Sequence, residues 1–508
     1  MNYQLDWNKP GSFSAGRDPL GLQAASVRLY TDLLPGLTNV TNRLRYFSFY
    51  CWVVRQFELR RHTFDEQKWS IFIRRVEAIY ALACQIGDSG TALGMAGSVW
   101  AGAHSSLEDS FDFTPWTDRP GQDGQYLKAA WGNFGQFYVR SMQQMHMLEE
   151  SSHRIQAVTP DYGQELADAF EQACPNACRL MLAAIDTGTI ERSACLAISD
   201  EAHPTYLEPA SDEAQVLVRY LCGDRKSDPT ASDRRATLWN VLNIVENTRV
   251  SDATALRREL YVQDNVGASM VGPLAGNLLG WRAYFINEFC HIALEVLLNS
   301  LTHRINETSG CHADVAAREL ARSVLTGHSP AMSVAELAEL SSIEALEHEH
   351  DRAGDLADLV RTAVAPKPEQ LADAVPLILS LWRRWGADTD LDRLLIDATV
   401  GGRSARGVFR FLDEVAGRPA FDGLAALIRK FVISNHLLIA GQKLASAGTY
   451  TYRFIVDEDG LVDGVPAEYG FTNPRLGNLL VFARDARLVD DSGVTEAGKA
   501  FLRADQPL

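Results

Sequence analysis

The sequence shows neither a signal-peptide pattern nor a long hydrophobic run, so we expect no leader segment and no membrane span. Its N-terminus, MNYQLDWNKP, has no basic stretch followed by an apolar one, as a secretory signal peptide would. The longest apolar stretches, such as Val375–Leu379, are far shorter than the roughly 20 residues that cross a membrane. We therefore expect a cytoplasmic protein without a membrane partner.

The sequence also lacks a cysteine framework. Its eight cysteines are scattered through stretches with apolar, helical periodicity. This distribution is typical of reduced, packed thiols rather than of disulfides. Cys174 and Cys178 have no second pair that would complete a zinc site. The cysteines therefore predict neither a disulfide-stapled domain nor a metal centre.

Common catalytic signatures are missing as well. There is no G-x-S-x-G elbow, and no glycine-rich dinucleotide motif follows a strand. Residues 493–500 fit a phosphate loop until Ala500, which replaces the Ser or Thr that binds Mg²⁺. We predict no catalytic residues and no cofactor, which favours a non-enzymatic chain.

The charge is large, negative and unevenly distributed. The 508 residues, too many for one core, carry a formal net charge of -17. Residues 1–75 hold eleven basic and six acidic residues, which leaves 37 basic and 59 acidic residues for the remainder. A basic N-terminal lobe could hold an anion such as nucleic acid. The alternative is that its arginines flank a core helix and stay solvated.

Residues 18–61 are more apolar than any other stretch of the sequence, and arginines recur along them. The pattern predicts a helix over 22–34, ended by Pro35-Gly36, and a buried helix over 38–62. The segment YFSFYCWVV is rich in strand formers, but an uninterrupted strand of this length is implausible. The second helix should therefore be the spine of an N-terminal domain.

Helical periodicity continues through most of the chain. It predicts a mostly α fold, with a multi-domain helical body and a small C-terminal α+β module. The predicted domains are an N-terminal helical domain (1–155), a middle helical domain (156–365), a helical segment packing on the body (366–447) and the α+β module (448–508).

The C-terminal module begins with a predicted strand over Thr449–Val456 and a hairpin at Asp459-Gly460. A helix to about Arg487, a short hairpin over 488–494 and a closing helix at Thr495–Leu502 follow. This order resembles the end of bacterial winged-helix modules.

The resemblance implies that five residues lie on or near the helix that faces a nucleic-acid groove: Asn473, Arg475, Asn478, Arg484 and Arg487. The alternative is a protein-docking module, which the acidic residues at 457–459 and 490–491 favour.

A second candidate anion site lies at the start of the spine helix. It comprises Asn39, Asn42, Arg43 and Arg45, where guanidiniums and the positive end of the helix could hold a phosphate. The alternative is that these arginines bridge the helix to acidic neighbours such as Asp18 and Asp32.

Two Glu-x-x-His pairs, Glu288/His291 and Glu347/His350, have the spacing of a di-iron site. Glu295 and Glu344 could add ligands. The second pair lies within residues 336–358, which hold eight acids and one arginine and therefore predict a solvated helix. We predict no metal site, and we interpret His436 as a packed core histidine.

These observations favour a non-enzymatic cytoplasmic subunit that scaffolds a multi-protein assembly. Protein partners are expected, and nucleic acid is a candidate partner through the basic lobe or the C-terminal module. A bacterial defence-type system is suggested by analogy only. The first alternative is a hydrolase acting on nucleic acid, with a dispersed site that uses Asp18, Asp32 and the N-terminal arginines. The second is a metal-dependent helical oxidase.

Overall fold

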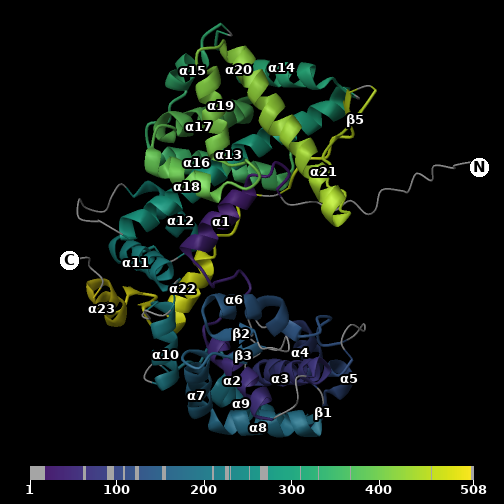
Figure 1. Ribbon diagram of the computed structural model, residues 1–508, viewed down its shortest axis with the longest axis vertical. Helices are drawn as coiled ribbons and strands as arrows, with labels where there is room; N and C mark the ends of the chain where they lie inside the picture. Colours follow the sequence, from purple (N-terminus) through teal and green to yellow (C-terminus); the bar gives the residue numbers. More distant parts are fainter. Residues whose placement is uncertain are drawn as a thin grey trace, which may run out of the picture. The chain divides into compact units, whose positions relative to one another are not determined.

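Most of the described chain is helical, as the sequence predicts (Figure 1). The computed structural model describes residues 18–60, 65–87, 97–106, 109–119, 125–150, 156–208, 211–223, 228, 230–250, 252–263, 273–308, 310–329, 331–366, 368–458, 460–468 and 470–504. The lead-in predicted for residues 1–17 and the hairpin residue Asp459 lie outside them.

The chain divides into two compact units, each built from several segments. The described residues of unit 1 come from 18–31, 258–263 and 278–474, and those of unit 2 from 32–257, 273–277 and 475–504. The four ranges predicted as domains remain a prediction.

The longest helix, α13 (Pro273–Thr308), supplies much of the core of unit 1. It is apolar nearly all round and is buried through residues 283–299, so other helices must cover it on most sides. The other helices of unit 1 are α1 (Gln23–Leu33), α12 (Ala253–Val262), α14 (Ala313–Val324), α15 (Val334–Leu340), α16 (Leu346–Thr362), α17 (Pro368–Trp385), α18 (Thr389–Ala398), α19 (Ala405–Val415), α20 (Ala420–Leu427) and α21 (Asn435–Ala447). Helices α1, α12 and α13 each extend into unit 2 at one end.

A π-helical turn, η2 (Ile428–Ser434), joins α20 and α21 into one continuous helix. This helix, Ala420–Ala447, is long and apolar enough to cross a membrane, which the sequence did not predict. More than half of its most apolar stretch is buried inside unit 1, as in the core helix of a globular fold.

Unit 2 has its core around the predicted spine helix, α2 (Arg45–Leu59), whose residues 45–57 are all buried. Phe49 stacks on Tyr80 of α3 at 4.2 Å between ring centroids, and Tyr50 lies 4.7 Å from Tyr138. The other elements are α3 (Glu66–Gly87), α4 (Ser98–His104), α5 (Thr114–Thr117), η1 (Phe134–Tyr138), α6 (Val139–Gln144), α7 (Gly163–Ala173), α8 (Pro175–Thr187), α9 (Arg192–Ala202), α10 (Asp212–Leu221), α11 (Ala231–Thr248), α22 (Leu476–Asp485) and α23 (Glu496–Ala504).

Helix α2 begins at Arg45, later than the predicted start near Thr38. Thr38 and Thr41 form a turn in which each hydroxyl accepts a hydrogen bond from the other residue's backbone N–H. Such local bonds compete with a helix. The N–H of Leu44 donates instead to the Asp485 carboxylate of α22, at 3.0 Å. A residue far along the chain therefore helps to set the start of the helix.

Strands are few and form two-stranded antiparallel pairs. These are β1 (Ser110–Asp112) with β4 (Thr189–Glu191), β2 (Leu148–Glu150) with β3 (Gln156–Val158), β5 (Ile455–Asp457) with β6 (Gly460–Val462), and β7 (Val489–Asp490) with β8 (Gly493–Val494).

The predicted strand over 449–456 is mostly wrong, since β5 begins only at Ile455. The Arg453 N–H donates to His436 Nε2 of α21, and the Arg453 carbonyl accepts from the Val465 N–H. Neither backbone group of Arg453 is therefore available to pair with a neighbouring strand. Hairpin β5–β6 belongs to unit 1, whereas α22, β7, β8 and α23 belong to unit 2.

Candidate functional site

Arg45, predicted to bind an anion, is buried in unit 2. Its guanidinium pairs with Glu213 at 2.9 Å, and the two side chains are only 3% and 1% exposed. It also donates to the backbone carbonyls of Glu201 and His203. Because Arg45 is enclosed by these acceptors, it holds α2 against α9 and α10.

The other N-terminal candidates lie in the loop before α2 and face α22. Arg43 pairs with Asp485 at 2.9 Å, and the Asn478 amide donates to Asn42 Oδ1 at 3.2 Å. Asn39 is exposed in the same loop. The structure therefore places Asn42 and Arg43 against helix α22, through Asn478 and Asp485.

The three C-terminal arginines surround helix α22. Arg475 precedes it with a left-handed backbone, whereas Arg484 and Arg487 are exposed at and beyond its end. The apolar face of α22 is packed inward, where Phe482 meets Phe47 edge to face at 5.7 Å. Asn478 and Asp485 on this helix are thus engaged with the protein itself.

A pocket of about 270 Å³ lies between the end of α11, helix α22 and the β7–β8 hairpin. Two arginines line it, Arg249 and Arg484, with two aspartates, Asp490 and Asp491. Leu480 and Val489 contribute apolar surface. The lining thus combines both signs of charge with apolar groups, and the two carboxylates would oppose a phosphate.

Unit 1 contains a buried polar cluster on α13. His291 Nε2 lies 2.9 Å from Glu295 Oε1, and both side chains are fully buried. Glu288 Oε2 accepts from the Thr472 N–H at 2.6 Å. Glu288 Oε1, both ring nitrogens of His291 and both carboxylate oxygens of Glu295 have no hydrogen-bond partner among the described residues, so the contact between His291 and Glu295 is an ion pair. Asp18, in the turn before α1, interacts electrostatically with His291 and Glu295.

This cluster does not assemble the di-iron site considered above. Among the described residues, no three His, Cys, Asp or Glu side chains are grouped so that they could hold one metal ion. His350 of the second pair packs edge-on against the Phe289 ring at 5.8 Å, and its Nδ1 faces Asp351. The two Glu-x-x-His pairs therefore do not face a common centre.

His436 is a core histidine, as predicted. It is fully buried, its Nδ1–H donates to the Pro19 carbonyl at 3.2 Å, and its Nε2 accepts from the Arg453 N–H at 2.7 Å. Burial lowers the pKa of His436 to about 4, so the ring is neutral and clamps the turn at residues 18–21.

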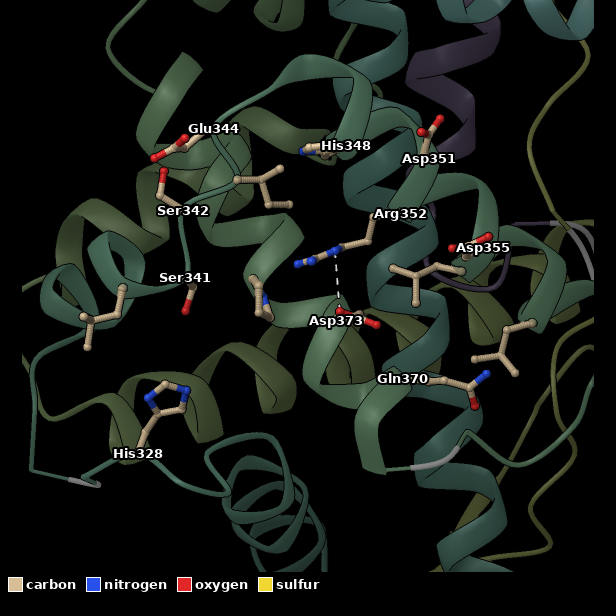
Figure 2. Close-up of a pocket in the computed structure, with 15 residues that line it drawn as sticks. His328, Ser341, Ser342, Glu344, His348, Asp351, Arg352, Asp355, Gln370 and Asp373 are labelled. Carbon is tan, nitrogen blue, oxygen red and sulfur yellow. Dashed lines mark ion pairs between the residues drawn. The ribbon is translucent and has the colours of Figure 1, made fainter.

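A groove of about 850 Å³ lies on unit 1, between α16, the start of α17 and the loop 341–344 (Figure 2). Helix α16 lines it with residues spaced three or four apart: His348, Asp351, Arg352, Asp355, Leu356 and Leu359. Figure 2 shows Arg352 reaching toward Asp373 of α17, and the two are 3.5 Å apart.

The groove is acidic. Its lining holds one guanidinium, that of Arg352, and four carboxylates, those of Glu344, Asp351, Asp355 and Asp373. The formal charge of the lining is therefore -3, with the two histidines counted as neutral. The sequence showed the acids of residues 336–358 but suggested only a solvated helix. The spacing of 348, 351, 352 and 355 was the available signal for a common face.

A buried carboxylate holds the loop at one end of this groove. Glu349 accepts hydrogen bonds from Tyr261 Oη at 2.5 Å, Ser380 Oγ at 2.7 Å and Arg384 Nε at 3.2 Å. Arg384 Nη2 in turn donates to the carbonyls of Ile343 and Glu344 at 2.5 and 2.9 Å. These hydrogen bonds hold the backbone of the loop 341–344 in place.

Comparisons with protein-family models, with curated proteins and with solved structures gave no match to this chain. Function is therefore inferred from the geometry of these sites.

Proposed function

We propose that the chain is a non-enzymatic subunit of a multi-protein assembly and that its C-terminal helix–hairpin–helix segment, α22 to α23, docks a protein partner. The observation that supports this most is the mixed-charge pocket beside α22, which is lined by Arg249, Arg484, Asp490 and Asp491. The order helix, hairpin, helix also supports the resemblance to winged-helix modules, some of which dock proteins.

Nucleic acid is the less favoured ligand of this segment. A phosphate backbone would meet the carboxylates of Asp490 and Asp491 beside Arg484, and it would gain little from so few exposed cations. Asn478 and Asp485 of the helix that would enter a groove are occupied within unit 2. A cytoplasmic location and an assembly associated with nucleic acid remain part of the proposal, and a bacterial defence role is suggested by analogy only.

The two enzymatic alternatives have less support. Arg45, the arginine suggested for a hydrolase, is enclosed by Glu213. The oxidase would need a group of metal ligands, and the described residues contain none of three or more.

The experiment combines a partner assay with an activity assay. The full chain is co-expressed with the products of its flanking genes, and co-purification is compared for wild type and the variant Arg484→Glu/Asp491→Lys. Arg179→Glu/Asp200→Lys, on exposed residues of unit 2 outside the pocket, is the control. We expect the pocket variant alone to lose the partner.

The purified chain is also incubated with nucleoside triphosphates, DNA and RNA. Turnover that disappears when one acidic or histidine residue is replaced would refute the non-enzymatic proposal. Retardation of DNA that Arg484→Glu/Arg487→Glu abolishes would show that the ligand of this segment is nucleic acid instead.

A further inference from the structure

The groove of unit 1 has two exposed carboxylates with no ion-pair partner. Of its four acids, Asp351 lies 3.7 Å from Arg258, and Asp373 is paired with Arg352. Glu344 and Asp355 are exposed and have no ion-pair partner among the described residues. Glu344 lies on the loop 341–344, and Asp355 lies on α16. A cationic ligand would meet them without breaking an existing contact.

The groove also offers apolar surface. Leu340, at its rim, is 66% exposed and is the most exposed large hydrophobic side chain among the described residues of unit 1. The lining also includes the buried side chains of Ile343 and Leu356, with Leu359 and Pro376. An exposed leucine in a groove with further apolar lining is a feature of protein interaction sites.

The groove is rigid where it would make contact. Arg384 and Ser380 fix the backbone of Ile343, and Glu349 fixes both of those side chains. A preformed loop spends little ordering free energy on binding, so even a modest contact area can give measurable affinity.

We propose that this groove binds a basic, amphipathic segment of a partner protein, with apolar side chains against Leu340 and the other apolar lining residues and with Lys or Arg side chains at Glu344 and Asp355. The inference rests on the proposed function, because it supplies a second docking surface for the same subunit. Charge complementarity identifies the occupant, because the acidic lining would repel nucleic acid. A polyamine has no apolar side chain that could pack against Leu340.

The probe is a labelled helical peptide of Leu and Lys in heptad spacing, about 18 residues long, which is enough to form a helix on the groove. Its affinity for the full chain is measured by fluorescence anisotropy. The variants are Glu344→Lys/Asp355→Lys and Leu340→Asp. The control, Asp397→Lys/Glu414→Lys, replaces two exposed acids of unit 1 outside the groove. Circular dichroism and urea midpoints establish that every variant is folded.

We expect the peptide to bind about tenfold more weakly to each groove variant and to bind the control like wild type, with affinity falling as salt rises. Equal affinities for all four proteins would overturn the proposal. A loss on charge reversal without a loss for Leu340→Asp, together with competition by spermine, would also overturn it, because the site would then take a small polycation. Neither result bears on the pocket beside α22, whose readout is co-purification.

Discussion

His291 Nε2 lies 2.9 Å from Glu295 Oε1, one turn further along α13, and neither side chain is exposed to solvent. Burial opposes a charged imidazole, but the Glu295 carboxylate outweighs it and raises the pKa of His291 to about 9. Burial raises the pKa of Glu295 as well. Asp18, Glu288 and Glu295 face the histidine, so its proton is held more tightly in the folded chain than in the unfolded one.

We predict that unit 1 loses stability in alkali. A raised histidine pKa contributes stability that is complete below about pH 6.5 and is lost as pH rises through about 9, and the raised pKa of Glu295 acts in the same direction. The loss should be about 3 kcal/mol. Urea unfolding and hydrogen exchange of α13 at pH 6.5, 8 and 9.5 would measure it. The variant His291→Gln/Glu295→Gln should lack the alkaline decline, and an unchanged slope in that variant would assign the decline to other groups.

Arg45→Ala should destabilise unit 2 rather than abolish an activity. The substitution leaves Glu213 buried without its cation, a loss on the order of 3–5 kcal/mol. Arg45→Met/Glu213→Leu removes both charges and should recover much of that loss. Arg60→Ala, which breaks a pair with the exposed Asp186, should cost no more than about 1 kcal/mol. An Arg45→Ala protein that keeps its wild-type unfolding midpoint would reopen the hydrolase hypothesis.

The contacts of α2 show which features of a helix the sequence can predict and which it cannot. Its buried, aromatic character and its length predicted a spine helix, and the structure confirms one. Its start could not be predicted, because the Leu44 N–H is satisfied by Asp485, from the other end of the chain. The strand predicted over 449–456 failed for a similar reason, since His436 takes the N–H of Arg453. Local patterns predict elements, whereas their ends depend on distant side chains.

The sequence did not predict the acidic groove, and the reason is similar. The acidic charge of residues 336–358 is evident in the sequence. The groove, however, forms only because α17 and the loop 341–344 lie opposite α16. The buried Glu349 that fixes this loop looks like any other acid of the stretch in the sequence. Its partners Tyr261, Ser380 and Arg384 come from two other helices.

Removing the Glu349 carboxylate should loosen the groove. Glu349→Gln keeps the shape but leaves at least one of three donors without its acceptor, and we expect a stability loss of about 1–3 kcal/mol. Hydrogen exchange at residues 341–344 should accelerate, and the peptide should bind the groove more weakly. Tyr261→Phe removes one donor and should cost about 1 kcal/mol. Unchanged exchange at 341–344 in Glu349→Gln would mean that packing alone holds the loop.

Gly21 should tolerate no side chain, for two separable reasons. Its φ of +78° lies in the left-handed region, and an added Cβ would stand 2.6 Å from both Arg403 Nε and Ile439 Cδ1. Gly402 has the same φ of +78°, yet a Cβ there would meet no atom within 4 Å. Gly402→Ala therefore isolates the backbone cost, about 1 kcal/mol.

Gly21→Ala adds the overlap to that cost, and we expect a total loss of about 2–4 kcal/mol. Urea unfolding of both variants gives the steric part by difference. The turn at residues 18–21 is clamped by His436 and by Lys443, whose ammonium donates to the Asp18 carbonyl at 2.9 Å. The turn therefore cannot move aside cheaply to admit the methyl group. Equal losses for the two variants would show that Arg403 and Ile439 yield without cost.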